Sequence, residues 1–384
     1  MGKGIRAHIG RHLIRKKLRK HKKEKSFVKG KAKKAGLPPG TIVYTGEKKE
    51  AKVRLWQFRY NQDTVEEKKD IDIRLLSSYL KAGTENTVMW LNIDGVHDPR
   101  LIEEIGIHFN IHPLVLEDIA NTTQRPKLED YEDYVYIVIR MLTYDKTEGG
   151  IHSEQLSLIL GKNYILTFQE EPGDIFDNIR DRIRTGKGRV RRMGADYLAY
   201  VIMDNIIDQY YKVLEGIGDR VEDMQHIILR RPEKQMLQGL HNLKRDLLFI
   251  RKSIWPLRDV MDRILRKECE LFTDPTLVYI KDVFDHTIQL MDQIDTYRDV
   301  ITTLLECYLS NVTVHTNLVM KRLTVITTIF MPLSVLAGIG GMSEWSMITG
   351  ASEDSFLWQY GLFLGITIII GVLTYIILKK KGWT

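Results

Sequence analysis

Cysteine is scarce in this chain, which has two in 384 residues. Cys269 and Cys307 lie far apart, and neither belongs to a pair with the short spacing of a thiolate metal site. The sequence also lacks the G-x-x-x-x-G-K-S/T pattern of a P-loop. These absences argue against a disulfide-rich secreted domain, a thiolate metal site and a P-loop ATPase, and they are compatible with a reducing compartment.

Acidic residues are nearly absent from the start of the chain. Residues 1–34 contain fifteen Lys or Arg and one acid, Glu24, whereas the other 350 residues contain 42 bases and 49 acids. This segment also lacks the continuous apolar stretch of a secretory signal, so we expect it to be retained. We interpret residues 1–40 as a disordered basic tail that contacts anionic lipid or nucleic acid, or that remains a solvated arm.

Charged residues are also absent from two long apolar runs, Leu323–Met342 with 20 residues and Phe356–Leu378 with 23. Each run is long enough to cross a hydrocarbon core of roughly 30 Å as a helix, although buried core helices are the alternative. Lys321 and Arg322 precede the first run and three lysines follow the second, while the segment between the runs has acids and no base. The positive-inside rule therefore predicts a multi-pass protein of the plasma or inner membrane with both termini in the cytoplasm.

The chain before these runs predicts a cytoplasmic α/β domain with a helical hairpin over residues 41–275. Residues 98–119 read as two short helices that part near His112-Pro113, and the composition becomes helical and highly charged after Gly194. Short β-rich runs precede and follow the two short helices: TIVYTG, KVRLWQF, VMWLNI, YVYIVIRMLTY, SEQLSLIL and YILTFQ.

Glycine and proline are absent from the 56 residues between Pro275 and Pro332. As one helix this stretch would be about 84 Å long, at about 1.5 Å per residue. A stalk helix over 276–342 would therefore continue into the first membrane span. The remaining segments are an external loop at 343–355, a second membrane helix at 356–378 and a basic cytoplasmic end at 379–384.

One face of this stalk is polar where a coiled coil would be apolar. Its positions at alternating steps of four and three include no Leu, Ile or Val, so the face either packs closely against other membrane helices or lines a water-filled pore among several copies. Mg²⁺ is the ion that suits such a pore best, because it gives up its water reluctantly and would pass in hydrated form. The positions are Glu306, Ser310, Thr313, Asn317, Met320, Thr324, Thr327, Met331, Ser334, Gly338 and Gly341.

The sequence resembles the CorA family of divalent-cation transporters over most of residues 50–384. The motifs that carry the resemblance are HPLVLEDI (112–119), QRPKLEDYEDYVYIV (124–138), RPEK (231–234), LKRDLLFIRKSIWPLRDV (243–260), YIKDVFDHTIQ (279–289) and TIFMPLSVLAGI (328–339). The resemblance implies a pentameric, funnel-shaped α-helical membrane channel with one pore, formed by the first spans of five identical chains. It also implies Mg²⁺ transport, with Co²⁺ and Ni²⁺ as further ions, and no organic cofactor.

The resemblance further implies regulation by Mg²⁺ bound between neighbouring cytoplasmic domains, which holds the pore closed. Asp118 and Asp282 match the family's carboxylates, and Glu117 and Asp204 are nearby candidates. The family's pore positions correspond to Asn317, Met320, Met331 and Ser334, and Glu306 stands where the family usually has Asp.

The outer mouth departs from the family's Gly-Met-Asn signature. The predicted selectivity mouth is Gly341, Met342, Ser343 and Glu344, and a Ser hydroxyl is shorter than an Asn amide. Ion choice therefore stays open between Mg²⁺ transport and a proton-coupled zinc transporter on the same scaffold. A cation-sensing membrane scaffold that does not conduct is a third hypothesis. We do not expect an enzyme, because the His and acidic residues form no nucleophile–base set.

Overall fold

The computed structural model describes residues 36–46, 53–71, 87–145, 150–173, 175–230, 234–340 and 353–381. The predicted basic tail up to residue 35 and the segment 341–352 lie outside these residues. The chain forms two compact units. One comprises the residues up to Asp223 together with His241–Ile301, and the other comprises Met224–Leu240 together with the residues from Thr302 onward.

A seven-stranded mixed sheet with the strand order β2-β1-β3-β7-β6-β5-β4 forms the centre of the first unit. Only the central β3–β7 pair is parallel, and the other pairings are antiparallel. The strands are β1 (Arg54–Tyr60), β2 (Val65–Lys68), β3 (Val88–Asp94), β4 (Lys127–Asp130), β5 (Tyr134–Asp145), β6 (Gly150–Gly161) and β7 (Tyr164–Gln169).

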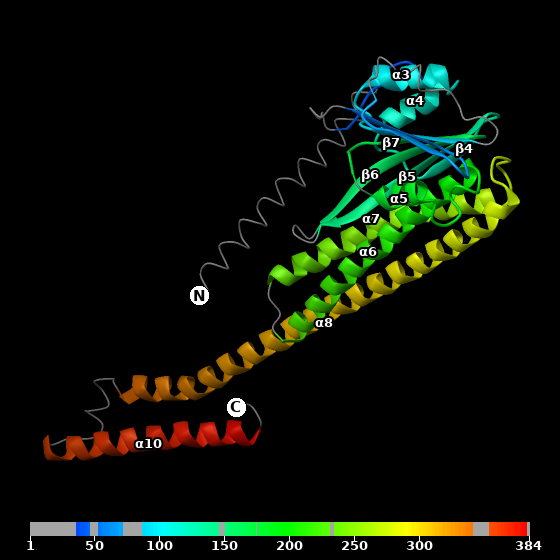
Figure 1. Cartoon of the computed structure of the whole chain (residues 1–384). Helices are drawn as coiled ribbons and strands as arrows, with labels where there is room; N and C mark the ends of the chain where they lie inside the picture. Colours follow the sequence, from blue (N-terminus) through cyan, green and yellow to red (C-terminus); the bar gives the residue numbers. More distant parts are fainter. Residues whose placement is uncertain are drawn as a thin grey trace. The chain divides into compact units, whose positions relative to one another are not determined.

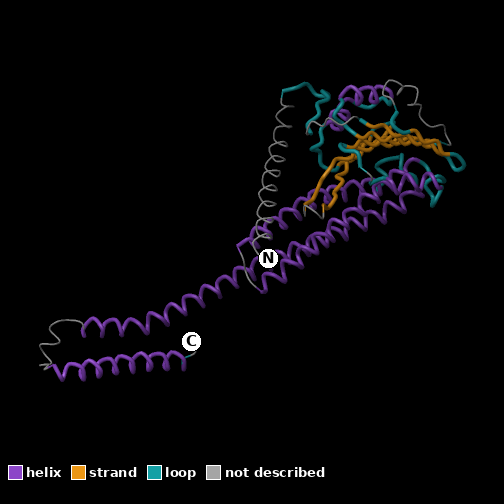
Figure 2. The backbone as a smooth tube through the Cα atoms, turned by 60° about the vertical axis from the view of Figure 1, so that its left-hand side comes forward, coloured by secondary structure: helices purple, strands orange, loops and turns teal. Residues whose placement is uncertain are grey.

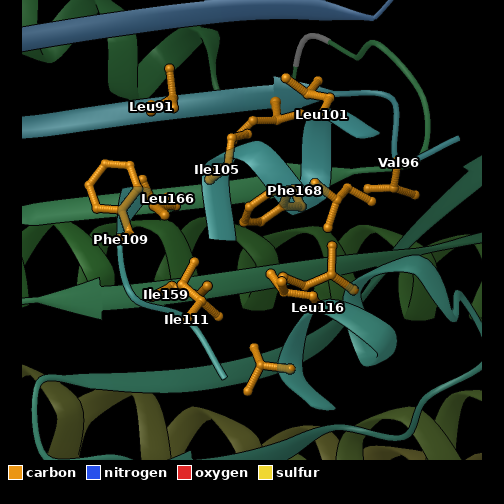
Figure 3. Packing of buried hydrophobic residues seen from close by; sticks show 14 of the residues in the cluster. Leu91, Val96, Leu101, Ile105, Phe109, Ile111, Leu116, Ile159, Leu166 and Phe168 are labelled. Carbon is orange, nitrogen blue, oxygen red and sulfur yellow. The ribbon is translucent and has the colours of Figure 1, made fainter. Parts of the chain in front are cut away.

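Helices cover both faces of this sheet (Figure 1). Helices α3 (Pro99–His108) and α4 (Pro113–Ala120) lie on one face, where their apolar sides form a core with alternate residues of the strands. Figure 3 shows Leu101 and Ile105 of α3 and Leu116 of α4 packed around Phe168 and Ile159. The opposite face packs against α5 (Asp177–Thr185), α6 (Ala195–Arg230) and α7 (Lys234–Leu265).

Local sequence signals explain where the two short helices begin. Asp98 caps α3 by accepting a hydrogen bond from the Arg100 N–H at 3.0 Å, and the Nδ1 atom of His112 accepts one from the Leu114 N–H at 3.2 Å. In each case a proline follows the cap, where its fixed φ suits the first helical turn. The predicted break at His112-Pro113 is therefore confirmed.

The prediction of a strand at TIVYTG is wrong. Residues 41–46 have no ladder partner and run along α4 instead. The Gly40 N–H donates to Glu117 Oε2 at 2.6 Å, and the Thr45 N–H donates to the Ala120 carbonyl at 3.3 Å. The alternating apolar residues Ile42 and Tyr44 pack against the core on this face of the sheet, so their burial does not require a ladder.

Two long helices dominate the rest of the chain. Helix α8 runs from Asp274 to Gly340 and passes through Pro332, and α10 runs from Glu353 to Lys380 (Figure 2). Both contain segments long and apolar enough to cross a membrane. The predicted α/β domain, long helix and two membrane helices are thus confirmed.

The carboxyl group of Glu154 on β6 is half-buried beside two other acids. Burial raises its pKa to about 7, the charges of Glu170 and Glu171 act in the same direction, and the Glu171 N–H, 2.7 Å from Oε1, opposes them. Because this pKa exceeds the ordinary value of 4.5, stability falls as the pH rises from about 4.5 to about 7.

We therefore expect Glu154→Gln to stabilise the protein above pH 7 by on the order of 1–3 kcal/mol and to have little effect near pH 5. Thermal melting across this pH range measures the difference. The exposed Glu132→Gln is the matched control. A variant with the same pH dependence as the wild type would show that Glu154 titrates normally.

Candidate ion pathway and regulatory carboxylates

The predicted pore positions from Glu306 to Ser334 all lie on α8, and all nine side chains are exposed in the single chain. The two methionines are the most apolar of them, with 56% of Met320 and 67% of Met331 exposed. Because much of this part of α8 is exposed, exposure alone does not identify a pore. The contact with α10 does distinguish the polar face of α8 from the face that α10 covers.

Helix α10 covers a different face of α8. The half-buried residues of α8 recur at helical spacing from Lys321 through Val325, Ile329 and Leu333 to Leu336. Leu333 lies close to Gly371, where an added Cβ would be 3.5 Å from the Leu333 Cδ1 atom. Met331 and Leu333 are two residues apart, which is about 200° around the helix. The polar positions therefore lie largely on the side of α8 that α10 leaves uncovered.

A hollow of about 620 Å³ lies between the two helices near Pro332. Pro332 has no N–H, so the carbonyl of Thr328 lacks its usual donor within the helix. Two of the predicted pore residues, Thr327 and Met331, are among its lining residues. The other lining residues are Thr328, Pro332, Val335, Leu336 and Ile370.

The threonine hydroxyls on the polar face have a fixed hydrogen-bond direction. Thr313, Thr324 and Thr327 each donate to the carbonyl four residues earlier, at 2.9–3.0 Å. A hydroxyl whose hydrogen is used in this way presents its lone pairs outward as acceptors. The water molecules around a hydrated cation point their hydrogens outward. These hydroxyls are thus suited to hold such an ion through its water.

The predicted selectivity mouth, Gly341, Met342, Ser343 and Glu344, lies outside the described residues. Its departure from the Gly-Met-Asn signature is a feature of the sequence alone.

Asp118 on α4 is held by two side chains. Its Oδ2 atom lies 2.5 Å from Lys127 Nζ, and its Oδ1 atom accepts a hydrogen bond from Gln124 Nε2. The adjacent Glu117 has a structural contact, because its Oε2 atom accepts the Gly40 N–H. Sequence reasoning missed Lys127 and Gln124, although both belong to the QRPKLED motif, because spacing in a loop and strand does not reveal which side chains meet.

Asp204 on α6 and Asp282 on α8 come together on the other side of the sheet from α4. Burial raises the pKa of Asp204 to about 6; the charges of Asp208 and Asp282 act in the same direction, and that of His286 opposes them. Asp282 is largely exposed, and its Oδ2 atom lies 4.0 Å from His286 Nε2. Sequence reasoning missed Asp208 and His286, which the four-residue helical spacing from Asp204 and Asp282 could have indicated.

The four predicted regulatory acids do not meet within one chain. The sheet separates Asp118 and Glu117 on α4 from Asp204 and Asp282 on α6 and α8 (Figure 1). Within the described part of a single chain, no three His, Cys, Asp or Glu side chains converge as metal ligands. The chemistry of the Asp204–Asp282 pair nevertheless fits a cation, because a bound positive charge relieves the repulsion between neighbouring carboxylates.

A protein-family model described as CorA-like Mg²⁺ transporter protein matches residues 85–380. The chain belongs to the CorA family. The cobalt/magnesium transport protein CorA of Thermotoga maritima is 44% identical over 350 residues, which cover 91% of this chain and 97% of that protein. The putative metal ion transporter YfjQ of Bacillus subtilis is 30% identical over 281 residues, which cover 72% of this chain and 83% of that protein.

The fold agrees with a solved CorA structure. The complete structure of the CorA magnesium transporter from Methanocaldococcus jannaschii has a TM-score of 0.70 at 21% identity and covers 85% of this chain and 98% of that one. The resemblance predicted from HPLVLEDI and the other motifs is confirmed.

Proposed function

We propose that this CorA-family protein conducts Mg²⁺, with Co²⁺ as a second ion, through a homopentameric pore lined by α8. The observation that carries the proposal is the acceptor-rich polar face of α8, which α10 leaves uncovered. One helix cannot enclose a path, so several copies must surround it. The relatives named for cobalt and magnesium transport support these ions, and neither zinc transport nor a non-conducting scaffold is favoured.

In this proposal each polar position forms a ring of five side chains. The rings of Asn317, Thr324 and Thr327 accept hydrogen bonds from the ion's water, so that Mg²⁺ passes without losing its whole shell. Met320 and Met331 form apolar constrictions, and Glu306 concentrates cations at the cytoplasmic end. Both termini face the cytoplasm, and the membrane is the plasma or inner membrane.

The proposed regulatory site lies between two subunits. Asp282 and Asp204 of one subunit face Asp118 and Glu117 of the next, which explains why these acids do not meet within one chain. The bound Mg²⁺ would supply positive charge that neutralises carboxylates on both sides of the interface. Asp282 is the most available ligand, because its carboxylate is exposed and lies 4.0 Å from the His286 ring nitrogen.

Purified protein in liposomes tests the proposed function directly. Influx of Mg²⁺ and Co²⁺ is measured with fluorescent indicators at several internal Mg²⁺ concentrations and without ATP. We expect influx at low internal Mg²⁺ and closure as internal Mg²⁺ rises. Protein that passes neither ion under any condition would rule out a channel.

The pKa of Asp204 predicts a pH dependence of Mg²⁺ binding. Because this pKa is about 6, the carboxyl is ionised near pH 7.5 and largely protonated near pH 5. Mg²⁺ should therefore raise the melting temperature more at about pH 7.5 than at about pH 5. Asp204→Asn should reduce this difference. An equal Mg²⁺ effect at both pH values would mean that Asp204 takes no part in binding.

A further inference from the structure

Lys127 holds the carboxylate that the proposed regulatory site requires. Its Nζ atom lies 2.5 Å from Asp118 Oδ2 and 2.6 Å from Glu129 Oε1, so one ammonium group bridges two acids. Only 26% of the Lys127 side chain and 18% of the Asp118 side chain are exposed. The pair is thus partly shielded from solvent, where screening is weaker than at the surface.

The surroundings of Asp118 fix this arrangement. Gln155 Nε2 donates to the Asp118 carbonyl at 3.1 Å, and its Oε1 atom accepts the Gln124 N–H at 3.0 Å. Gln124 then donates to Asp118 Oδ1. Each carboxylate oxygen already accepts one hydrogen bond, so a metal ion at Asp118 would share the carboxylate with these donors and would lie beside the charge of Lys127.

Lys127 is the donor that carries a charge. Burial lowers its pKa, but the hydrogen bonds to Asp118 and Glu129 outweigh burial and leave the pKa above its ordinary value. The side chain is therefore an ammonium ion throughout the physiological range. A like charge 2.5 Å from a ligand oxygen opposes a divalent ion both by repulsion and by occupying a lone pair.

Glu129 is the second carboxylate partner of this ammonium group. It lies two residues from Lys127 on β4, and its other oxygen, Oε2, accepts a hydrogen bond from the Tyr131 hydroxyl at 3.3 Å. Lys127 can therefore leave Asp118 and keep one carboxylate partner. The exchange needs only a rotation of the lysine side chain and no movement of the strand.

We propose that Lys127 is a tethered competitor of the regulatory divalent cation, held by both Asp118 and Glu129 when the ion is absent and by Glu129 alone when it binds. The inference rests on the proposed regulatory role of Asp118. In this role Lys127 weakens ion binding, so that the site fills only at high cytoplasmic Mg²⁺. Glu129 strengthens ion binding, because it stabilises the position to which Lys127 withdraws.

The two residues thus predict opposite effects. Lys127→Gln removes the competing charge and should lower the Mg²⁺ midpoint of protection from limited proteolysis by about tenfold, as expected for one charged hydrogen bond. Glu129→Gln should raise the midpoint, because Lys127 then depends on Asp118 alone. Lys127→Arg should stay near the wild type. A purely structural role would weaken the site in both neutralised variants.

The experiment uses the full-length protein in nanodiscs of neutral lipid, with Mg²⁺ titrated in each variant. Lys68→Gln is the matched control, because Lys68 is also paired with a carboxylate, Glu66, at 2.8 Å on another strand. Melting in the absence of Mg²⁺ identifies any variant that fails to fold. An unchanged or raised midpoint in folded Lys127→Gln would overturn the inference.

Asp118→Asn separates this inference from the proposed function. If it raises the midpoint while Lys127→Gln does not lower it, the regulatory site stands and Lys127 is not a competitor. If Asp118→Asn leaves the midpoint unchanged, the proposed regulatory site is wrong and the inference fails with it.

Discussion

Thr324→Val is expected to lower Mg²⁺ influx into liposomes by about tenfold or more. The substitution keeps the shape of the side chain and removes the hydroxyl that donates to the Met320 carbonyl at 2.9 Å. The proposed pore of five chains would then lose a whole ring of acceptors. Because a single neutral hydrogen bond contributes about 0.5–1.5 kcal/mol, five weakened contacts to one hydrated ion exceed a tenfold effect even when each is small.

Thr328→Val is the matched control for this experiment. Thr328 also donates to a backbone carbonyl four residues earlier, at 2.7 Å, but it is not one of the polar positions of α8 that form the proposed pore face. We expect its influx to stay within a few-fold of the wild type. Equal losses in both variants would mean that the hydroxyls stabilise the helix and that the polar face does not line the pathway.

Asp282→Asn should leave the channel open at internal Mg²⁺ concentrations that close the wild type. Its carboxylate is the most accessible of the predicted regulatory ligands, with 65% of the side chain exposed. Removing one charged ligand from each proposed regulatory interface should raise the Mg²⁺ concentration needed for closure by about tenfold or more. Influx measured against internal Mg²⁺ gives the shift directly.

Asp292→Asn serves as the control, because Asp292 is an exposed acid on the same helix ten residues further along. Its closure curve should match that of the wild type. If Asp282→Asn closes at the wild-type concentration, Asp282 is not a ligand. If both variants shift equally, the effect comes from the overall charge of α8.

Much of the fold could be predicted from the order of residues because the signals are local. The absence of Gly and Pro between Pro275 and Pro332 predicts one helix, and α8 continues even through Pro332. The β-rich runs YVYIVIRMLTY and SEQLSLIL predict β5 and β6, which pair along their whole length. TIVYTG shows the limit of this reasoning, because its β-rich composition suits a strand but its residues run along α4.

The polar face of α8 could likewise be read from spacing, since a helix converts sequence steps into directions. What spacing cannot supply is the partner of each side chain. The environment of Asp204 depends on Asp282, which is 78 positions later and on another helix, and that of Asp118 depends on Lys127 in a strand. Burial and charge act through distance in space, so only the packing of α6 against α8 determines the pKa of Asp204, and only the packing of α4 beside β4 determines the ion pair of Asp118.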